Sequence, residues 1–127
     1  MRFSKNKEYK RTDIQKILGG ELQSYLPQKN GIILAACLSI ESNPDAPHEV
    51  QVGNAPKVVR KAKLLSKQPE TRFPVFTRRD QRSDSYYNFI GYYRFKSLSE
   101  NKRAIEKAEK KSSRHGELAC ILYLIEA

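Results

Sequence analysis

The stretch from Arg78 to Lys96 decides the fold, because a charged turn runs there into a long strand-like segment. It reads Arg78-Arg79-Asp80-Gln81-Arg82-Ser83-Asp84-Ser85-Tyr86-Tyr87-Asn88-Phe89-Ile90-Gly91-Tyr92-Tyr93-Arg94-Phe95-Lys96. From Tyr86 onward apolar and polar side chains largely alternate, which is the period-two pattern of a half-buried strand. We expect one face of this strand to enter the core and the other to meet solvent. The core-facing set is Tyr87, Phe89, Gly91, Tyr93 and Phe95, and the outward set is Tyr86, Asn88, Ile90, Tyr92, Arg94 and Lys96.

A preceding strand is expected from Arg72 to Arg78, so that the two strands form a hairpin with a polar tip. Gly91 interrupts the later strand with a residue that has no side chain to pack. A glycine at such a position indicates a bulge, a bend of a barrel-like sheet or the close approach of a ligand. The sequence leaves these three interpretations open.

The chain before the hairpin predicts an α+β order of elements. Thr12-Asp13-Ile14-Gln15 has the spacing of a capping box, and Gly19-Gly20 can end the short helix that follows. Residues 31–40 are apolar without alternation, which is typical of a central strand buried on both faces. The segment from Glu41 to Pro56 holds three prolines among turn-forming residues and is expected to be a long loop.

Two basic helices and a final strand are expected in the remaining segments. The first helix would run from Asn54, a suitable N-cap, to Gln68, although the β-branched pair Val58-Val59 leaves a strand as the alternative. A lysine-rich helix is expected to begin at Ser99 and to end before Gly116. Residues 117–126 predict a last apolar strand.

Length and composition indicate one α+β domain spanning residues 1–127. Hydrophobic residues make up 39% of the chain, which is enough for one core, and a second core would be too small to be stable. No run approaches the roughly 20 apolar residues that cross a bilayer. The charged N-terminus is not followed by an apolar signal core, so a cytoplasmic location is expected.

Cysteine and histidine usage gives no sign of a cofactor or a metal. Cys37 and Cys120 lie in apolar strand-like runs without zinc or redox spacing, which predicts buried reduced thiols; a disulfide between them is the less favoured alternative. His48 and His115 each lack a second ligand at metal spacing and are expected at the surface.

Basic charge is concentrated in one half of the chain. Residues 57–114 carry 17 Lys and Arg against 6 Asp and Glu, in a protein with a net charge of +10. Cations attract phosphate through long-range Coulomb force and counterion release, and aromatic rings offer stacking faces to bases. The combination predicts a non-catalytic surface for nucleic acid, with double-stranded DNA ahead of RNA.

Ten residues are the candidates for this surface, in two groups. The expected phosphate anchors are Lys57, Arg60, Lys61, Arg78, Arg79 and Arg82, and the expected reading face is Tyr86, Asn88, Tyr92 and Arg94. We expect these residues to converge into one concave patch. The loop from Asn43 to Asn54 is expected to close over a base.

Five segments together resemble the PUA-like reader domains, including the SRA-like and EVE-like modules that accompany modification-dependent restriction nucleases and helicases. They are Gly19-Gly20-Glu21-Leu22-Gln23, Pro27, the strand from Gly31, Pro74-Val75-Phe76-Thr77-Arg78, and Tyr87-Asn88-Phe89-Ile90-Gly91-Tyr92-Tyr93-Arg94-Phe95. The resemblance implies a curved mixed β-sheet or PUA-like pseudo-barrel with flanking helices. It also implies binding of DNA or RNA, with a modified or flipped base held in an aromatic pocket.

The chain departs from the SRA pattern in two respects. It has no Gly-Asp-Met segment and no tryptophan, so a tryptophan-walled base cage is excluded. No nuclease or helicase module accompanies the domain in this sequence, so an output would come from a separate nuclease or helicase subunit or from occlusion of the site.

Two other classes of function compete with this prediction. Pro44-Asp45 with Glu109-Lys110-Lys111 mimics the acidic motif of a small metal-dependent nuclease, but the same Glu-x-Lys spacing recurs by chance at Glu8 and Glu100. A basic protein-binding or inhibitor module acting on an acidic partner would use the same positive field. Steep salt dependence of DNA binding would distinguish nucleic acid from a protein partner.

Overall fold

A computed structural model describes residues 3–82 and 84–127 of the chain. The order of elements is β1 (Glu8–Tyr9), α1 (Arg11–Leu18), β2 (Gln28–Lys29), β3 (Ile32–Ile33), β4 (Ala36–Ser39), β5 (Glu49–Gly53), α2 (Pro56–Ser66), β6 (Phe73–Arg78), β7 (Tyr87–Ser99), α3 (Lys102–Ser112) and β8 (Leu118–Glu126). This is an α+β fold, as the sequence predicts. None of the helices in these two ranges combines the length and apolar character that a membrane span requires.

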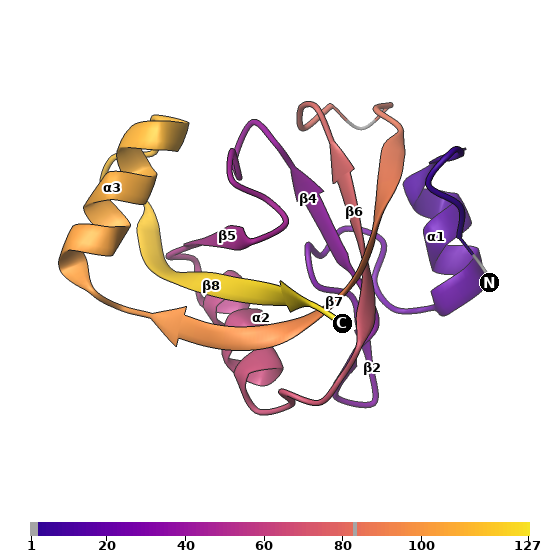
Figure 1. The fold of residues 1–127 in the computed structure, drawn as a ribbon, viewed down its shortest axis with the longest axis horizontal. Coiled ribbons are helices and arrows are strands. Elements are labelled where there is room, and N and C mark those ends of the chain that lie inside the picture. The colour runs from indigo at the N-terminus through magenta and orange to yellow at the C-terminus, as the bar shows by residue number, and fades with distance from the viewer. Residues whose placement is uncertain (1–2, 83) are drawn as a thin grey trace.

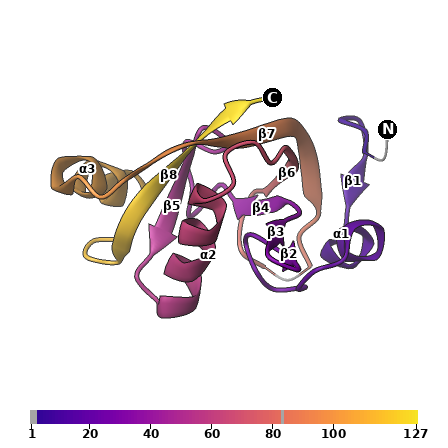
Figure 2. The ribbon, with the colours of Figure 1, turned by 90° about the horizontal axis from the view of Figure 1, so that it is seen from below.

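One curled mixed sheet organises the molecule. Its strands follow the order β4-β6-β7-β8-β5, β1 pairs with β7, and only the pair β4–β6 is parallel. Figure 1 shows β7 and β8 running together across the molecule, with α3 at one end and α1 at the other. In Figure 2 the sheet forms an arch, and α2 lies between β5 and the β2–β3 hairpin. The predicted curved sheet with flanking helices is therefore confirmed.

Three clusters of buried side chains hold the sheet, and the smallest packs Ala108 of α3 against Leu118 and Ile121 of β8. The α2-side core contains Leu38, Val75 and Tyr93 together with Ala62 and Leu65 of α2. The α1-side core lies across the β4–β6–β7 part of the sheet and combines Ile14 of α1 with Cys37, Phe76, Tyr87 and Phe89. Because both faces of β4 are covered, its four residues are all buried.

A bulge in β7 changes the predicted alternation. Val75 pairs with Gly91 and Phe76 pairs with Phe89, so β7 carries one extra residue between them. The bulge that Gly91 indicated is present, and it reverses which side chains share a face. Phe89 and Tyr92 therefore pack together on the α1-side core, with ring centroids 5.3 Å apart. The expectation that Tyr86, Asn88 and Tyr92 share one outward face is wrong for this reason.

The strand predicted at residues 31–40 is neither continuous nor central. It is interrupted between β3 and β4, and β4 stands at the end of the sheet order. Its apolar character has another cause, because the segment before β2 covers the open edge. Cys37 N donates to Tyr25 O at 2.8 Å, and Leu34 N donates to Pro27 O at 2.8 Å.

The predicted loop from Glu41 to Pro56 contains a buried strand, β5. Val50 and Val52 are fully buried, and β5 pairs along β8. Residues 49–53 of the segment that was expected to close over a base are fixed in the sheet, so residues 43–54 do not form the continuous loop that the sequence predicts. Asn43 is itself buried, and its side chain bridges the two ends of the arch: Nδ2 donates to Ser39 O at 3.1 Å, and Oδ1 accepts from Gln51 N at 2.8 Å.

The three helices form where the sequence predicts them, with different ends. The N-cap of α1 is Lys10, whose backbone N–H donates to Asp13, so the capping box begins two residues before Thr12. The N-cap of α2 is Ala55 and Pro56 is its first helical residue, so the helix begins one residue later than predicted; Asn54 N donates to Glu117 O at 2.9 Å. β7 extends through Ser99, and α3 begins after Asn101, which accepts from Ala104 N. Cys37 and Cys120 are buried free thiols, as expected.

Candidate functional site

Two adjoining hollows lie on the open side of the arch. The α2 groove, about 770 Å³, is bounded by residues 21–28 and by α2. The arginine cleft, about 460 Å³, extends from β4 to β5, and Cys37 of the α1-side core and Leu38 of the α2-side core both line it. The two share Gln23, Tyr25 and Val58 in their walls, so they form one continuous concave surface. The Tyr25 hydroxyl donates to Val58 O at 2.6 Å, and this bond holds the wall that the two hollows share.

The α2 groove contains three of the predicted phosphate anchors, which differ in availability. Lys57 and Arg60 are exposed on α2. Lys61 is half-buried, and its Nζ binds Glu21 Oε2 at 2.5 Å and Leu26 O at 3.0 Å. Lys61 therefore ties the segment after α1 to α2, and its charge is already paired. Lys57 and Arg60 are the better candidates for an external anion.

The pKa of Glu21 reports the strength of its contact with Lys61. Partial burial by itself would raise the pKa of Glu21, but hydrogen bonds from Lys61 Nζ and Gln28 N outweigh it and lower the pKa to about 2. The carboxylate thus stays charged at all ordinary pH values. It fixes the rim of the α2 groove and removes one positive charge from it.

Three arginines from distant parts of the sequence line the arginine cleft: Arg11 of α1, Arg78 at the end of β6, and Arg114 after α3. The Nη2 group of Arg11 donates to Glu21 O at 2.8 Å and to Ser24 O at 2.7 Å. Arg78 Nη1 donates to Arg82 O at 2.8 Å, and its guanidinium lies 4.8 Å from the Tyr87 ring centroid. Arg78, a predicted anchor, therefore also holds the hairpin tip in place.

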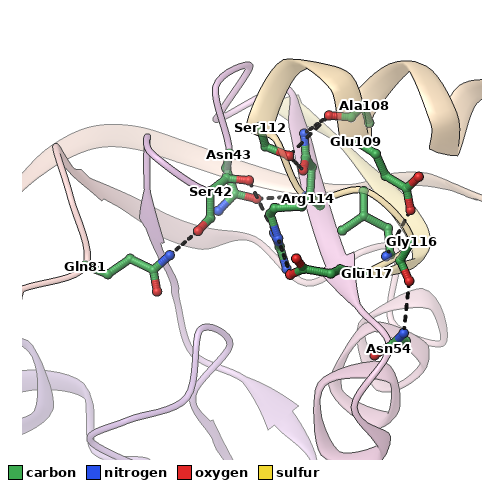
Figure 3. Close-up of polar contacts among 12 residues, drawn as sticks. Ser42, Asn43, Asn54, Gln81, Ala108, Glu109, Ser112, Arg114, Gly116 and Glu117 are labelled. Carbon is green, nitrogen blue, oxygen red and sulfur yellow. Dashed lines mark hydrogen bonds and ion pairs between the residues drawn. The ribbon is translucent and has the colours of Figure 1, made fainter.

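Arg114 occupies the opposite wall of the cleft. Its Nη1 donates to Ser42 O at 3.3 Å, and its Nε lies 3.7 Å from a carboxylate oxygen of Glu117. Figure 3 shows Arg114 between these two partners, with Gln81 reaching Ser42 from the other side. The contact between Gln81 and Ser42 joins the hairpin tip to the turn after β4.

The two buried groups beside Arg11 and Arg78 are not reactive. Burial raises the pKa of the Cys37 thiol to about 11, against the opposing positive charges of Arg11 and Arg78. Burial likewise raises the pKa of Tyr87, although both arginines oppose the shift. Both side chains therefore stay neutral at pH 7, and the arginines supply the charge of the cleft.

The two remaining predicted anchors, Arg79 and Arg82, lie at the hairpin tip. Both are exposed. Arg82 is 3.6 Å from Asp80 and 3.7 Å from Asp84, so its charge is partly compensated by local carboxylates. The tip also includes residue 83, which lies outside the described residues. Neither Arg79 nor Arg82 lines the two hollows.

The four residues predicted to read bases are not gathered in one place. Tyr86 is 45% exposed and lies under Lys10, whose Nζ is 5.8 Å from the ring centroid. Tyr92 is half-buried against Phe89 and Arg72. Asn88 is exposed opposite Glu8 of β1, and Arg94 is exposed opposite Ile125 of β8. None of these four lines the hollows, so the expected single patch of hairpin and rings does not form.

The acidic residues of the nuclease-like motif have separate structural partners. Asp45 binds Lys111 Nζ at 2.6 Å. Glu109 is buried, and its Oε2 accepts from Leu118 N at 3.2 Å. Among residues 3–82 and 84–127, no three His, Cys, Asp or Glu side chains come together as metal ligands would.

The sequence did not identify Arg11, Arg114 or Tyr25 as site residues. Arg114 belongs to a run of basic residues that is typical of a solvated helix, and Arg11 opens a short helix of ordinary composition. Only the curling of the sheet brings their segments to the same cleft. No pattern along the chain could have signalled this convergence.

Comparison of the chain with protein-family models, with curated proteins and with solved structures finds no match. A functional conclusion therefore depends on the chemistry of the two hollows.

Proposed function

We propose that this protein is a non-catalytic nucleic-acid-binding module of PUA-like character that binds double-stranded DNA in preference to RNA. One observation carries the proposal. The continuous surface of α2 groove and arginine cleft is lined by six basic side chains and two acidic ones: Lys57, Arg60, Lys61, Arg11, Arg78 and Arg114 against Glu21 and Glu117. The net charge of +10 adds a long-range field that would draw a polyanion to this surface.

The chemistry of the groove suits phosphate contacts. Lys57 and Arg60 lie on one side of α2, exposed and three residues apart, so both can reach a backbone that runs along the helix. Such contacts release condensed counterions and give affinity without sequence preference. The free cysteines suit a reducing cytoplasm, which is the compartment we propose.

Paired helix variants test the proposal. In Lys57→Gln/Arg60→Gln, two groove cations are neutralised. In the matched control Lys102→Gln/Arg103→Gln, the same two residue types are neutralised on the exposed first turn of α3. We expect the groove variant to bind a DNA duplex more weakly than the control does. Its plot of log affinity against log salt should be shallower by about 2, one unit for each lost phosphate contact.

Two results would overturn this proposal. Equal losses in the two variants would mean that binding follows net charge and not the groove. No duplex binding even at low salt would favour an acidic protein partner for the same surface. Gel shifts with plain, methylated and hydroxymethylated duplexes, single strands and RNA would test the preference for duplex and the reading of a modified or flipped base.

A further inference from the structure

The arginine cleft differs from the α2 groove in the origin and partners of its charges. Arg11, Arg78 and Arg114 come from three separate segments, and the one carboxylate in the cleft wall is Glu117. The Glu117 side chain is 63% exposed, so water weakens its hold on Arg114. The wall thus carries three positive charges and one negative, a balance of +2. Positive groups gathered in this way repel one another unless an anion binds between them.

The internal hydrogen bonds of Arg11 and Arg78 leave their charges uncompensated. They go to the carbonyl oxygens of Glu21, Ser24, Gln81 and Arg82, which carry no full negative charge. These bonds orient the guanidinium groups and would lower the entropy cost of binding a ligand. Arg78 Nε is buried without a hydrogen-bond partner, so no internal acceptor compensates this part of the guanidinium either.

Gly53 makes room for the third arginine. A Cβ atom at this position would lie 3.1 Å from Arg114 Nη2, which is closer than almost all such contacts. The absence of a side chain at the end of β5 therefore allows the guanidinium to lie against the strand. Gln51, on the same strand, is fixed by Ala108 O at 2.9 Å and by the Ser112 hydroxyl at 2.5 Å. The β5 wall of the cleft is thus rigid and shaped around Arg114.

We propose that the arginine cleft binds the phosphate monoester of a nucleotide-sized ligand. A phosphate monoester carries a charge of about −1.5 to −2 at pH 7, which matches the local balance of +2, whereas a diester or a carboxylate carries only one charge. Arginine binds phosphate oxygens through paired N–H groups. The monoester can belong to a free nucleotide or to the end of a strand.

The dimensions of the cleft agree with this ligand. A volume of about 460 Å³ exceeds the needs of a bare phosphate and lies in the range of small-molecule sites, about 300–1,000 Å³. Tyr25, which is only partly buried, also lines the cleft and can give a flat ligand apolar contact, whereas Tyr87 is buried and packs against Arg78. This inference deepens the proposed function, because the same three arginines are part of the proposed nucleic-acid surface. Lys57 and Arg60 line only the α2 groove, so variants of the two hollows distinguish duplex binding from nucleotide binding.

Calorimetric titration with deoxyadenosine 5′-monophosphate, deoxyadenosine and inorganic phosphate tests the proposal. We expect the monophosphate to bind at least tenfold more tightly than either of the others. Arg114→Gln should weaken its binding at least tenfold, whereas Arg94→Gln, on the outer part of β7, should leave it unchanged. Equal binding of nucleotide and nucleoside, or of wild type and Arg114→Gln, would overturn the proposal.

A second variant keeps the test decisive if Arg114→Gln fails to fold. Arg114→Lys retains every charge but loses the paired N–H groups, so several-fold weaker binding by a folded Arg114→Lys protein is expected, and unchanged binding would contradict the site. Oligonucleotides with and without a 5′-phosphate distinguish the two ligand sources. Tighter binding of the phosphorylated oligonucleotide assigns the cleft to strand ends. Equal binding of the two oligonucleotides assigns it to free nucleotides. Duplex binding that persists in Arg114→Gln while nucleotide binding is lost would separate this site from the proposed function.

Discussion

At the scale of single residues, Asn43 closes the open side of the arch. No backbone ladder joins β4 to β5, and the side chain of this buried asparagine bonds to both ends. The arginine cleft lies against this bridge, since Asn43 forms part of its wall. A side-chain bridge of this kind holds two strand ends at a fixed separation without filling the space between them.

Replacement of Asn43 should therefore destabilise the fold. Asn43→Ala removes the partner of the buried Gln51 N–H, whereas the Ser39 carbonyl still accepts from the backbone N–H of residue 43 at 2.9 Å. We expect the free energy of unfolding to fall by about 1–3 kcal/mol. Urea unfolding measures the loss. Asn54→Ala serves as the control, because the Asn54 side chain is exposed and makes one long contact of 3.5 Å with Gly116 O. Equal stability of the two variants would disprove the bridging role.

The Glu21–Lys61 pair should make stability depend on pH in the acid range. The folded pKa of Glu21, about 2, lies below its ordinary value of 4.5, so its contribution is present above pH 4.5 and is lost as the pH falls toward 2. Because the Glu21 side chain is 42% exposed, we expect solvent screening to limit the effect to about 1 kcal/mol.

Unfolding curves at pH 7 and near pH 2 measure this contribution. Glu21→Gln should be less stable than wild type at pH 7 and equal to it near pH 2. Glu70→Gln, at an exposed position, should match wild type at both. A constant difference between Glu21→Gln and wild type across the range would show that the charge of Glu21 is not the cause.

At the scale of elements, β7 determines the shape of the sheet. Its first half pairs with β6 and its second half with β8, and a register irregularity occurs in each pairing. The bulge near Gly91 places Tyr92 in the α1-side core and Tyr93 in the α2-side core. The strand can thus supply side chains to both clusters as the sheet curls.

Gly91→Ala tests the role of this bulge. The φ angle of Gly91 is 145°, which side chains rarely adopt, while the nearest atom to an added Cβ is 3.7 Å away. The penalty is therefore one of backbone strain and not of crowding, and we expect a loss of about 1–3 kcal/mol in thermal or urea unfolding. Ser97→Ala, at an exposed position of the same strand, should cost far less. A Gly91→Ala protein as stable as Ser97→Ala would contradict the strained geometry.

The sequence predicted which helices and strands form better than it predicted which strands pair with one another. Periodicity located α2, β6, β7 and β8, although it left a strand as the alternative for α2 and missed the bulge in β7. It failed for β5, because these five residues end in Gly53 and lie between Pro47 and Pro56, and this is the composition of a loop. The position of β4 at the sheet edge also escaped prediction, since burial under a covering segment and burial between two strands produce the same apolar run.

At the scale of the whole molecule, the open side of the arch gathers charges that are distant in sequence. The basic block of residues 57–114 predicted a positive surface, but Arg11 lies outside it, and the hairpin tip partly neutralises its own Arg82. Of the two tyrosines predicted to stack on bases, Tyr92 packs against the α1-side core and Tyr86 is exposed outside both hollows. The positive charge of the surface could be predicted from composition. The position of the two hollows could not, because they form only when the sheet curls.

Chemical-shift mapping of the ¹⁵N-labelled protein during titration with a DNA duplex at low salt tests the central claim most directly. The proposal requires the largest shifts at residues 21–28 and along α2, with Lys57 and Arg60 among them. Shifts confined to α3 and to the outer part of β7, with the groove unaffected, would contradict it.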